Sequence, residues 1–94
     1  MSPRKAGVAM KKQTFIICLE DEDGKTIDFE RWTFKKVETC IDHMIMLYNG
    51  YYSVYKDSLD KAAHVVAYPT PDGYNRSDAV WKVSADEFRK LLKA

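Results

Sequence analysis

An acidic glycine turn between two apolar segments is the feature that most constrains the fold of this chain. The turn is Asp21-Glu22-Asp23-Gly24. Residues 13–19 before it are rich in β-branched and aromatic side chains, and residues 26–33 after it alternate between apolar and polar ones. Both patterns are typical of strands bounded by a turn. The segment therefore predicts a β-hairpin.

The length of the hairpin loop decides which side chains share a face. With a three-residue loop, Glu22-Asp23-Gly24, the glycine adopts the left-handed conformation of a bulge residue. Leu19 then lies opposite Ile27, and Ile17 opposite Phe29. This register predicts one apolar face that looks toward the helices. Its members are Phe15, Ile17, Leu19, Ile27 and Phe29.

The alternative is a two-residue loop, Asp23-Gly24. It would place Ile17 and Leu19 on the same face as Asp28 and Glu30. Burying those carboxylates without partners would be strongly unfavourable. The three-residue loop and its register are therefore preferred.

The next segment predicts a helix over residues 34–49, because apolar residues recur there at helical spacing. Thr33 is expected to cap its start, and Gly50 to end it in the left-handed conformation. The apolar stripe consists of Phe34, Val37, Cys40, Ile41, Met44, Ile45, Leu47 and Tyr48.

The second half of the chain predicts two more strands and a helix. Residues 51–61 are left open, with a short helical turn at 57–61 as one reading. Strands are expected over residues 62–68 and 79–83, joined by a loop at 69–78. The last helix is expected to begin at Ser84, because Ser84-Ala85-Asp86-Glu87 has the spacing of a capping box.

The order ββαββα predicts an α+β fold, a two-layer sandwich with an antiparallel sheet of about four strands and two helices on one face. The chain of 94 residues is long enough for a single domain, assigned to residues 13–94. Residues 1–12 are expected to form a flexible basic arm. Met10-Lys11-Lys12 resembles a natural start, so residues 1–9 are interpreted as an upstream extension or an added segment.

Charge is distributed unevenly between the arm and the domain. Arg4, Lys5, Lys11 and Lys12 precede the first strand, whereas residues 13–94 carry 11 basic and 14 acidic side chains. A nucleic-acid-binding domain usually has a basic surplus, so that function is disfavoured but kept as an alternative. Its carriers would be the arm with Lys35 and Lys36, and Trp32 or Tyr74 would stack on bases.

The sequence predicts no metal, cofactor or catalytic site. The acidic turn has its glycine at the fourth position, where a calcium loop between helices needs the sixth. Cys18 and Cys40 form no CxxC pair, and His43 and His64 lack metal-ligand spacing. A non-enzyme is expected. A small enzyme is the third hypothesis, which would need a deep pocket lined by the histidines or several acids.

The longest apolar runs have only five residues, phenylalanine to leucine at 15–19 and methionine to tyrosine at 44–48. A signal peptide or a membrane span needs many more. We therefore expect no contact with a membrane, and we expect a cytoplasmic location.

The leading hypothesis is a non-catalytic protein-interaction or self-association module, of a size common among small bacterial and phage proteins. Its partner would be another protein or a second copy. The face opposite the predicted core has an apolar centre with charged surroundings, as interaction surfaces do. The proposed surface consists of Ile16, Asp28, Glu30 and Trp32. Tyr74 and Arg76, residue types that anchor interfaces, extend it onto the 69–78 loop.

Overall fold

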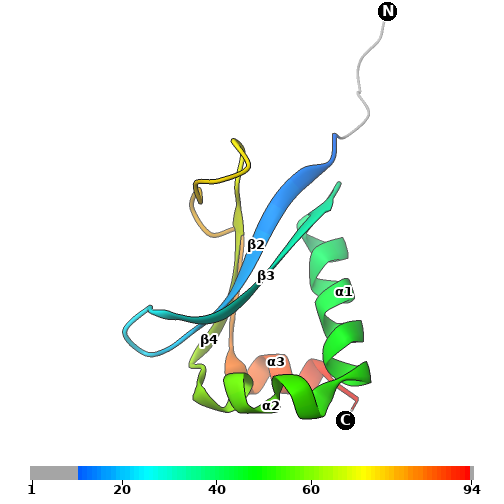
Figure 1. The fold of residues 1–94 in the computed structure, drawn as a ribbon, viewed down its shortest axis with the longest axis vertical. Helices are drawn as coiled ribbons and strands as arrows, with labels where there is room; N and C mark the ends of the chain where they lie inside the picture. The colour runs from blue at the N-terminus through cyan, green and yellow to red at the C-terminus, as the bar shows by residue number, and fades with distance from the viewer. Residues whose placement is uncertain (1–10, 94) are drawn as a thin grey trace, which may run out of the picture.

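The computed structural model describes residues 11–93. Within them, four strands form one antiparallel sheet in the order β3-β2-β4-β5, and three helices accompany it (Figure 1). The predicted α+β fold is confirmed, with one helix more than expected. In chain order the elements are β2 (Gln13–Glu20), β3 (Thr26–Phe34), α1 (Val37–Gly50), α2 (Tyr52–Lys61), β4 (His64–Pro69), β5 (Trp81–Ser84) and α3 (Ala85–Leu91).

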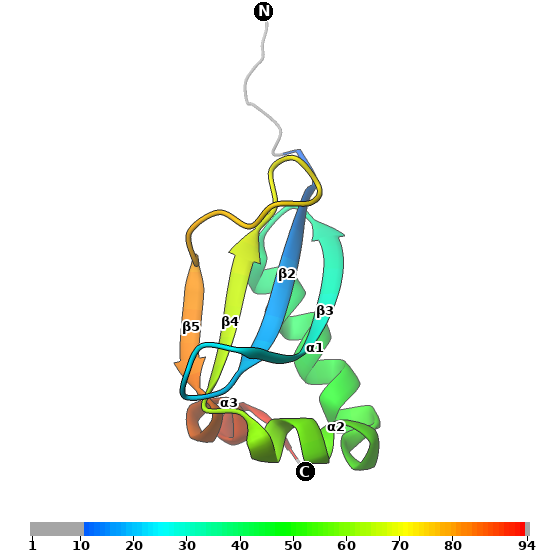
Figure 2. The same cartoon turned by 60° about the vertical axis from the view of Figure 1, so that its left-hand side comes forward.

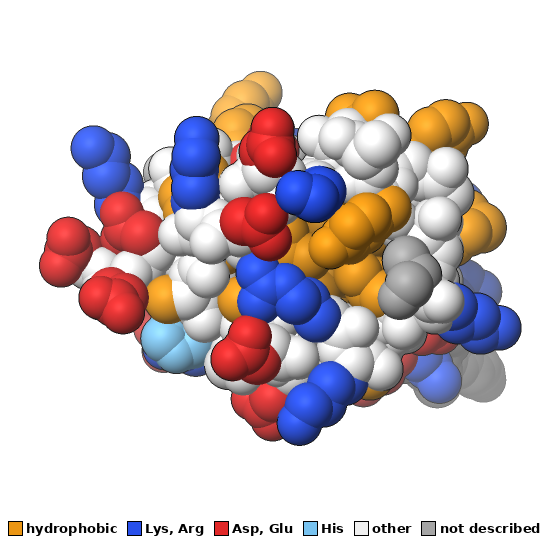
Figure 3. Space-filling view, turned by 90° about the horizontal axis from the view of Figure 1, so that it is seen from below, with side chains coloured by type: hydrophobic (Ala, Val, Ile, Leu, Met, Phe, Trp, Pro, Cys, Tyr) orange, Lys and Arg blue, Asp and Glu red, His pale blue; other side chains and the backbone are white. Residues whose placement is uncertain are grey.

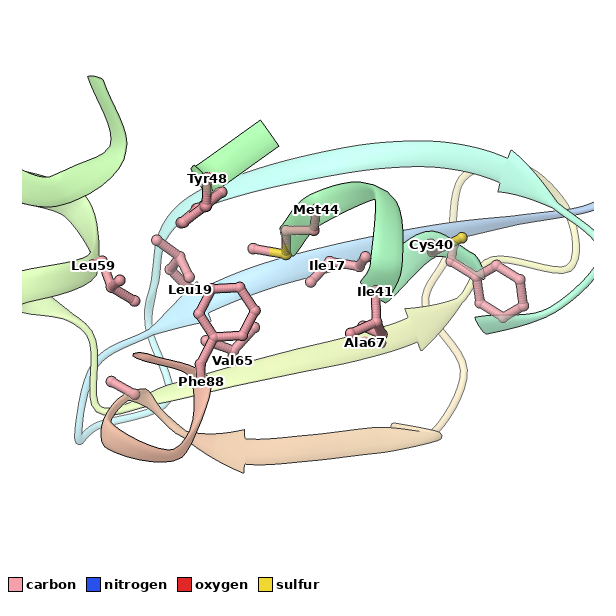
Figure 4. Packing of buried hydrophobic residues seen from close by; sticks show 12 residues of the cluster. Ile17, Leu19, Cys40, Ile41, Met44, Tyr48, Leu59, Val65, Ala67 and Phe88 are labelled. Carbon is pink, nitrogen blue, oxygen red and sulfur yellow. The ribbon is translucent and has the colours of Figure 1, made fainter. Parts of the chain in front are cut away.

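The core lies between the sheet and the helices, and the sheet face that lines it is called the inner face. Side chains of β2 and β4 meet those of all three helices there (Figure 4). Removing such side chains from water contributes about 1.5–3 kcal/mol each, so this cluster drives folding. Its fully buried members include Ile17, Leu19, Cys40, Met44, Tyr48, Leu59, Val65, Ala67 and Phe88.

The hairpin turn has the predicted three-residue loop. The Asp21 amide donates to the Lys25 carbonyl at 2.9 Å, which closes the loop around residues 22–24. Gly24 has a φ of 81°, the left-handed conformation that a residue with a side chain rarely adopts. The Asp21 carboxylate accepts hydrogen bonds from the amides of Asp23 and Lys25, both at 2.9 Å. These bonds give the acid a structural role in the turn.

The predicted register beyond the turn is wrong, because a β-bulge follows immediately. Glu20 pairs with Thr26, as a three-residue loop requires, but Leu19 pairs with Asp28. One extra residue, Ile27, is accommodated in β3. Because side chains alternate with a period of two, one extra residue exchanges the two faces for the rest of the strand.

The bulge turns Asp28, Glu30 and Trp32 toward the inner face and Phe29 toward the other. The carboxylates are tolerated because β3 is an edge strand, where both acids remain only half-buried. The free-energy cost of burying an unpaired carboxylate applies to a fully buried group, so Asp28 and Glu30 largely avoid it. Ile27 and Trp32 still pack against the core cluster.

The first helix begins later than predicted. Phe34 is the last residue of β3, and the helix starts at Val37 without a side-chain cap. Thr33 is not a capping residue; its hydroxyl lies 2.9 Å from that of Thr14 on the neighbouring strand. Gly50 is helical and is not the left-handed cap, since positive φ among the described glycines occurs only at Gly24 and Gly73.

The segment left open by the sequence, residues 51–61, forms the full helix α2. Leu59 is its buried residue, and the Tyr55 ring stacks on that of Tyr48 with centroids 4.2 Å apart. The capping box of α3 is confirmed. The Ser84 hydroxyl accepts from the Glu87 amide and the Glu87 carboxylate accepts from the Ser84 amide, both at 3.0 Å.

Candidate interaction surface on the outer sheet face

The sheet face turned away from α1 is called the outer face, and Figure 2 shows its four strands side by side with α1 behind them. Residues paired across antiparallel strands share a face. The register therefore defines two central rows. One row is Phe29, Cys18, Val66 and Lys82. The other is Arg31, Ile16 and Tyr68. Val80 lies in a bend directly before β5, and its amide donates to the Ala67 carbonyl at 2.9 Å.

The structure divides the site residues predicted from the sequence between two places. Ile16 and Arg76 lie on the outer face. Asp28, Glu30 and Trp32 do not, and their assignment to this face is corrected by the register. The Trp32 ring meets the His43 ring of α1 edge-on, with centroids 4.9 Å apart. Trp32 is thus a core contact.

Exposure on the outer face falls from its margins to its centre. Phe29 on β3 is 51% exposed and Val80 next to β5 is 52% exposed. Between them, Cys18 and Val66 are each 1% exposed although no helix of the described chain covers this face. The outer face therefore has a buried apolar centre with a half-exposed ring, Phe29, at its β3 margin.

Part of the cover over this centre is a cluster of polar side chains around Arg76, which reaches over from the loop at residues 70–80. The turn end of the β2–β3 hairpin, which crosses in front of the sheet in Figure 2, supplies another part. The Arg76 guanidinium lies over the Tyr68 ring, 4.5 Å from the centroid, and donates to the Cys18 sulfur at 3.5 Å. The same Nη1 is 3.8 Å from a carboxylate oxygen of Glu20. Tyr68 donates its hydroxyl proton to that oxygen as well.

Burial governs ionisation in this cluster. Desolvation raises the pKa of the Cys18 thiol, and the nearby Arg76 cation only partly opposes it. Burial, with the hydrogen bond to the Glu20 carboxylate, raises the pKa of Tyr68 to about 12. Cys18 is consequently a neutral thiol near pH 7. It lacks the depressed pKa that a nucleophilic cysteine needs.

The loop that carries Arg76 is ordered by its own hydrogen bonds. The Asp72 carboxylate accepts from the amides of Tyr74 and Asn75 at 2.8 and 2.7 Å, and these bonds lower the pKa of Asp72. The Ser77 amide donates to the Pro69 carbonyl at 2.8 Å, which closes the base of the loop. Tyr74 is 81% exposed on this loop, so it does not pack on the sheet.

On the inner face, burial is the first cause that raises the pKa of Glu30, the Asp28 carboxylate adds to it, and His43 opposes it. Such a carboxylate lowers stability as the pH rises above the ordinary glutamate pKa. Glu30→Gln is therefore expected to raise the free energy of unfolding at pH 7, by less than about 1 kcal/mol because solvent screens the site. The gain should vanish near pH 3.5, where Glu30 is protonated in both states.

Urea unfolding at the two pH values measures this effect. Glu22→Gln, at an exposed glutamate in the hairpin turn, is the matched control and should change stability little at either pH. A Glu30→Gln gain as large at pH 3.5 as at pH 7 would contradict the electrostatic explanation.

Residues 11–93 contain acidic side chains, two histidines and two cysteines that could in principle form an active or metal site. No group of three or more histidine, cysteine, aspartate or glutamate side chains there could hold a metal ion. A cavity of about 390 Å³ lies between the hairpin turn and the end of α2, lined by the acids 21–23 and Asp60. Neither histidine lines it. Several acidic side chains gather at the left margin of Figure 3, the side on which Figure 1 draws the hairpin turn.

None of the described helices combines the length and the apolar character needed to cross a membrane.

The basic residues Arg4 and Lys5 of the predicted arm lie outside the described residues, and Lys11 and Lys12 are exposed. Comparison with known proteins found no match to a family model, to a curated protein or to a solved structure. The outer face must therefore be interpreted from its own chemistry.

Sequence reasoning missed several members of the outer face. The predicted register puts Phe29, and with it Arg31, on the wrong face, because the bulge at Ile27 exchanges the two faces of β3. Glu20 could have been recognised from the sequence. It follows Ile16 and Cys18 in the alternation of β2, so it lies on the same face, and a carboxylate on an apolar face needs a partner there. Its two partners, Tyr68 and Arg76, are 48 and 56 residues away along the chain, and only the folded structure brings them together.

Proposed function

We propose that this chain is a non-catalytic self-association module in which two copies meet through their outer faces. The observation that carries the proposal is the half-exposed Phe29 ring at the margin of an apolar centre, formed by Ile16, Cys18 and Val66, that no described helix covers. Exposed apolar surface next to polar margins is characteristic of interaction sites. Arg76 and Tyr68 add residue types that frequently anchor interfaces.

Charge supports a second copy as the partner. Arg31 and Lys82 place positive charge in the central rows of the outer face. The hairpin turn, with Glu22 and Asp23, points to the side of the sheet away from α1 (Figure 1). In a two-fold pair, the acidic turn of each copy would extend over the basic side chains of the other. Such complementarity selects the partner and orients it.

Sedimentation equilibrium over a range of protein concentrations tests the proposal. The wild-type chain is expected to form a dimer that weakens with added salt. Phe29→Glu should shift it to monomer, because the variant puts a carboxylate in the apolar contact. Met46→Glu is the matched control, since Met46 is 58% exposed but lies on α1. A wild-type monomer at millimolar concentration, or equal effects of the two variants, would refute the proposal.

A second candidate function, single-strand nucleic-acid binding, is favoured by one observation. The outer face brings an exposed aromatic ring, Phe29, together with Arg31 and Lys82, and single strands bind by stacking on aromatic rings beside positive charge. Titration of a single-stranded oligonucleotide at rising salt discriminates the two. Phosphate binding should weaken steeply with salt and be lost in Arg31→Ala. Absence of binding at low salt excludes this candidate.

A further inference from the structure

The centre of the outer face is less exposed than its position would allow. Cys18 and Val66 lie on neighbouring strands of a face without a helix, yet each is 1% exposed. A sheet face that nothing packs against normally leaves its side chains open to water. The cover comes from two other parts of the chain. The turn end of the β2–β3 hairpin crosses in front of the sheet in Figure 2 and brings Thr26 close to Cys18, and the Arg76 guanidinium donates to the Cys18 sulfur.

Arg76 is held in its covering position by three weak contacts. The guanidinium stacks on Tyr68, points one nitrogen at the Cys18 sulfur, and faces the Glu20 carboxylate at 3.8 Å, beyond hydrogen-bond distance. Sulfur is a weak acceptor, so none of these contacts is a strong hydrogen bond. The Arg76 side chain is 44% exposed and Glu20 only 9%. The arginine is thus the movable member of the pair.

We propose that Arg76 is a side-chain gate, which covers Cys18 at the centre of the outer face when closed and admits a binding partner to Cys18 when displaced. The backbone need not unfold for this movement. The Ser77 and Val80 amides keep their bonds to Pro69 and Ala67 at 2.8 and 2.9 Å while the side chain swings into solvent.

The proposed self-association supplies a group that would open the gate, and this part of the inference rests on it. The acidic turn of a second copy, with Glu22 and Asp23, would compete with Glu20 for the guanidinium. Glu20 would keep the Tyr68 hydroxyl as its donor after the exchange. A carboxylate that is nearly buried would therefore not be left without a partner, which is the usual obstacle to breaking such a pair.

Alkylation by iodoacetamide, followed by mass spectrometry of the two cysteine peptides, tests the gate in the full chain. At concentrations low enough for a monomer, Arg76→Ala is expected to raise the labelling rate of Cys18 about tenfold, the size expected for losing an exposed ion pair and a cation–π contact. Cys40 is buried in the core and should keep its rate. Arg89→Ala is the matched control, because Arg89 forms its ion pairs with Asp60 and Asp86 of the helices.

The direction of the change is diagnostic. Arg76 lowers the pKa of the Cys18 thiol against the larger effect of burial. Removing the arginine without opening the site would therefore reduce the thiolate fraction and slow the labelling. A Cys18 rate that stays the same or falls would overturn the gate. A parallel rise at Cys40 would also overturn it, since both thiols would then be reached through global unfolding.

This test and the sedimentation test fail independently. If Cys18 opens selectively in Arg76→Ala but the wild-type chain stays monomeric, the gate stands and the second copy is excluded as the partner. If the chain dimerises through Phe29 but Cys18 does not respond, the interaction surface stands without a gate.

Discussion

Trp32→Ala is expected to lower the free energy of unfolding by about 2–4 kcal/mol, because it removes a large ring that packs against the core and against His43. Phe29→Ala, at an aromatic residue of the same strand, should lower it by less than about 1 kcal/mol, since Phe29 is half exposed on the outer face. Urea unfolding of the two variants measures the difference.

The comparison tests the face assignment directly. The two residues are three positions apart in β3, so the face each one occupies depends on the bulge at Ile27. A larger loss in Phe29→Ala than in Trp32→Ala would indicate that the faces are exchanged, and the candidate surface would have to be redrawn.

Phe88→Ala is expected to lower the free energy of unfolding by about 3–5 kcal/mol. The side chain is completely buried, and its ring meets that of Tyr48 edge-on at 5.4 Å. A domain of this size has only about 5–10 kcal/mol in total, so the variant should be close to unfolding. Phe88→Leu retains most of the volume and should lose less than about 1.5 kcal/mol.

Thermal and urea unfolding, followed by circular dichroism, measure both Phe88 variants. Equal, small losses would mean that α3 does not contribute to the core. The cluster would then depend on α1, α2 and the sheet, and Phe88 would have to be exposed.

The hairpin shows how far local sequence signals reach. The glycine turn predicted its own geometry, because a residue with positive φ at position 24 is compatible with few loop types. The bulge one pair further on has no comparable signal. Ile27 occupies it, and nothing in an isoleucine distinguishes a bulged position from a regular one. The register was therefore decided by the core, which gains the area of Trp32.

The start of one helix could be predicted from the sequence, and the starts of the other two could not. The start of α3 was predictable because the capping box is local. The side chains of Ser84 and Glu87 each accept a hydrogen bond from the backbone amide of the other residue. The start of α1 was not predictable, because Phe34 continues the pairing of β3 opposite Gln13 and so depends on a strand that comes earlier in the chain. The helix α2 lacks a cap signal and has one buried anchor, Leu59.

The part of the outer face that β2 contributes could be predicted from the sequence. Alternation along β2 placed Ile16 and Cys18 opposite the core correctly, since β2 contains no bulge in its central part. The two faces of β3 were exchanged in the prediction, because the bulge was not foreseen. The cluster of Glu20, Tyr68 and Arg76 joins β2, β4 and a loop, and no spacing along the chain encodes that meeting.

Cross-strand backbone NOEs between β2 and β3 provide the most direct test of the claim that a bulge at Ile27 defines the outer face. Contacts that pair Cys18 with Phe29 and Ile17 with Glu30 are expected. Contacts that pair Ile17 with Phe29 instead would contradict the claim. They would return Trp32 to the solvent side and remove Phe29 from the proposed interaction surface.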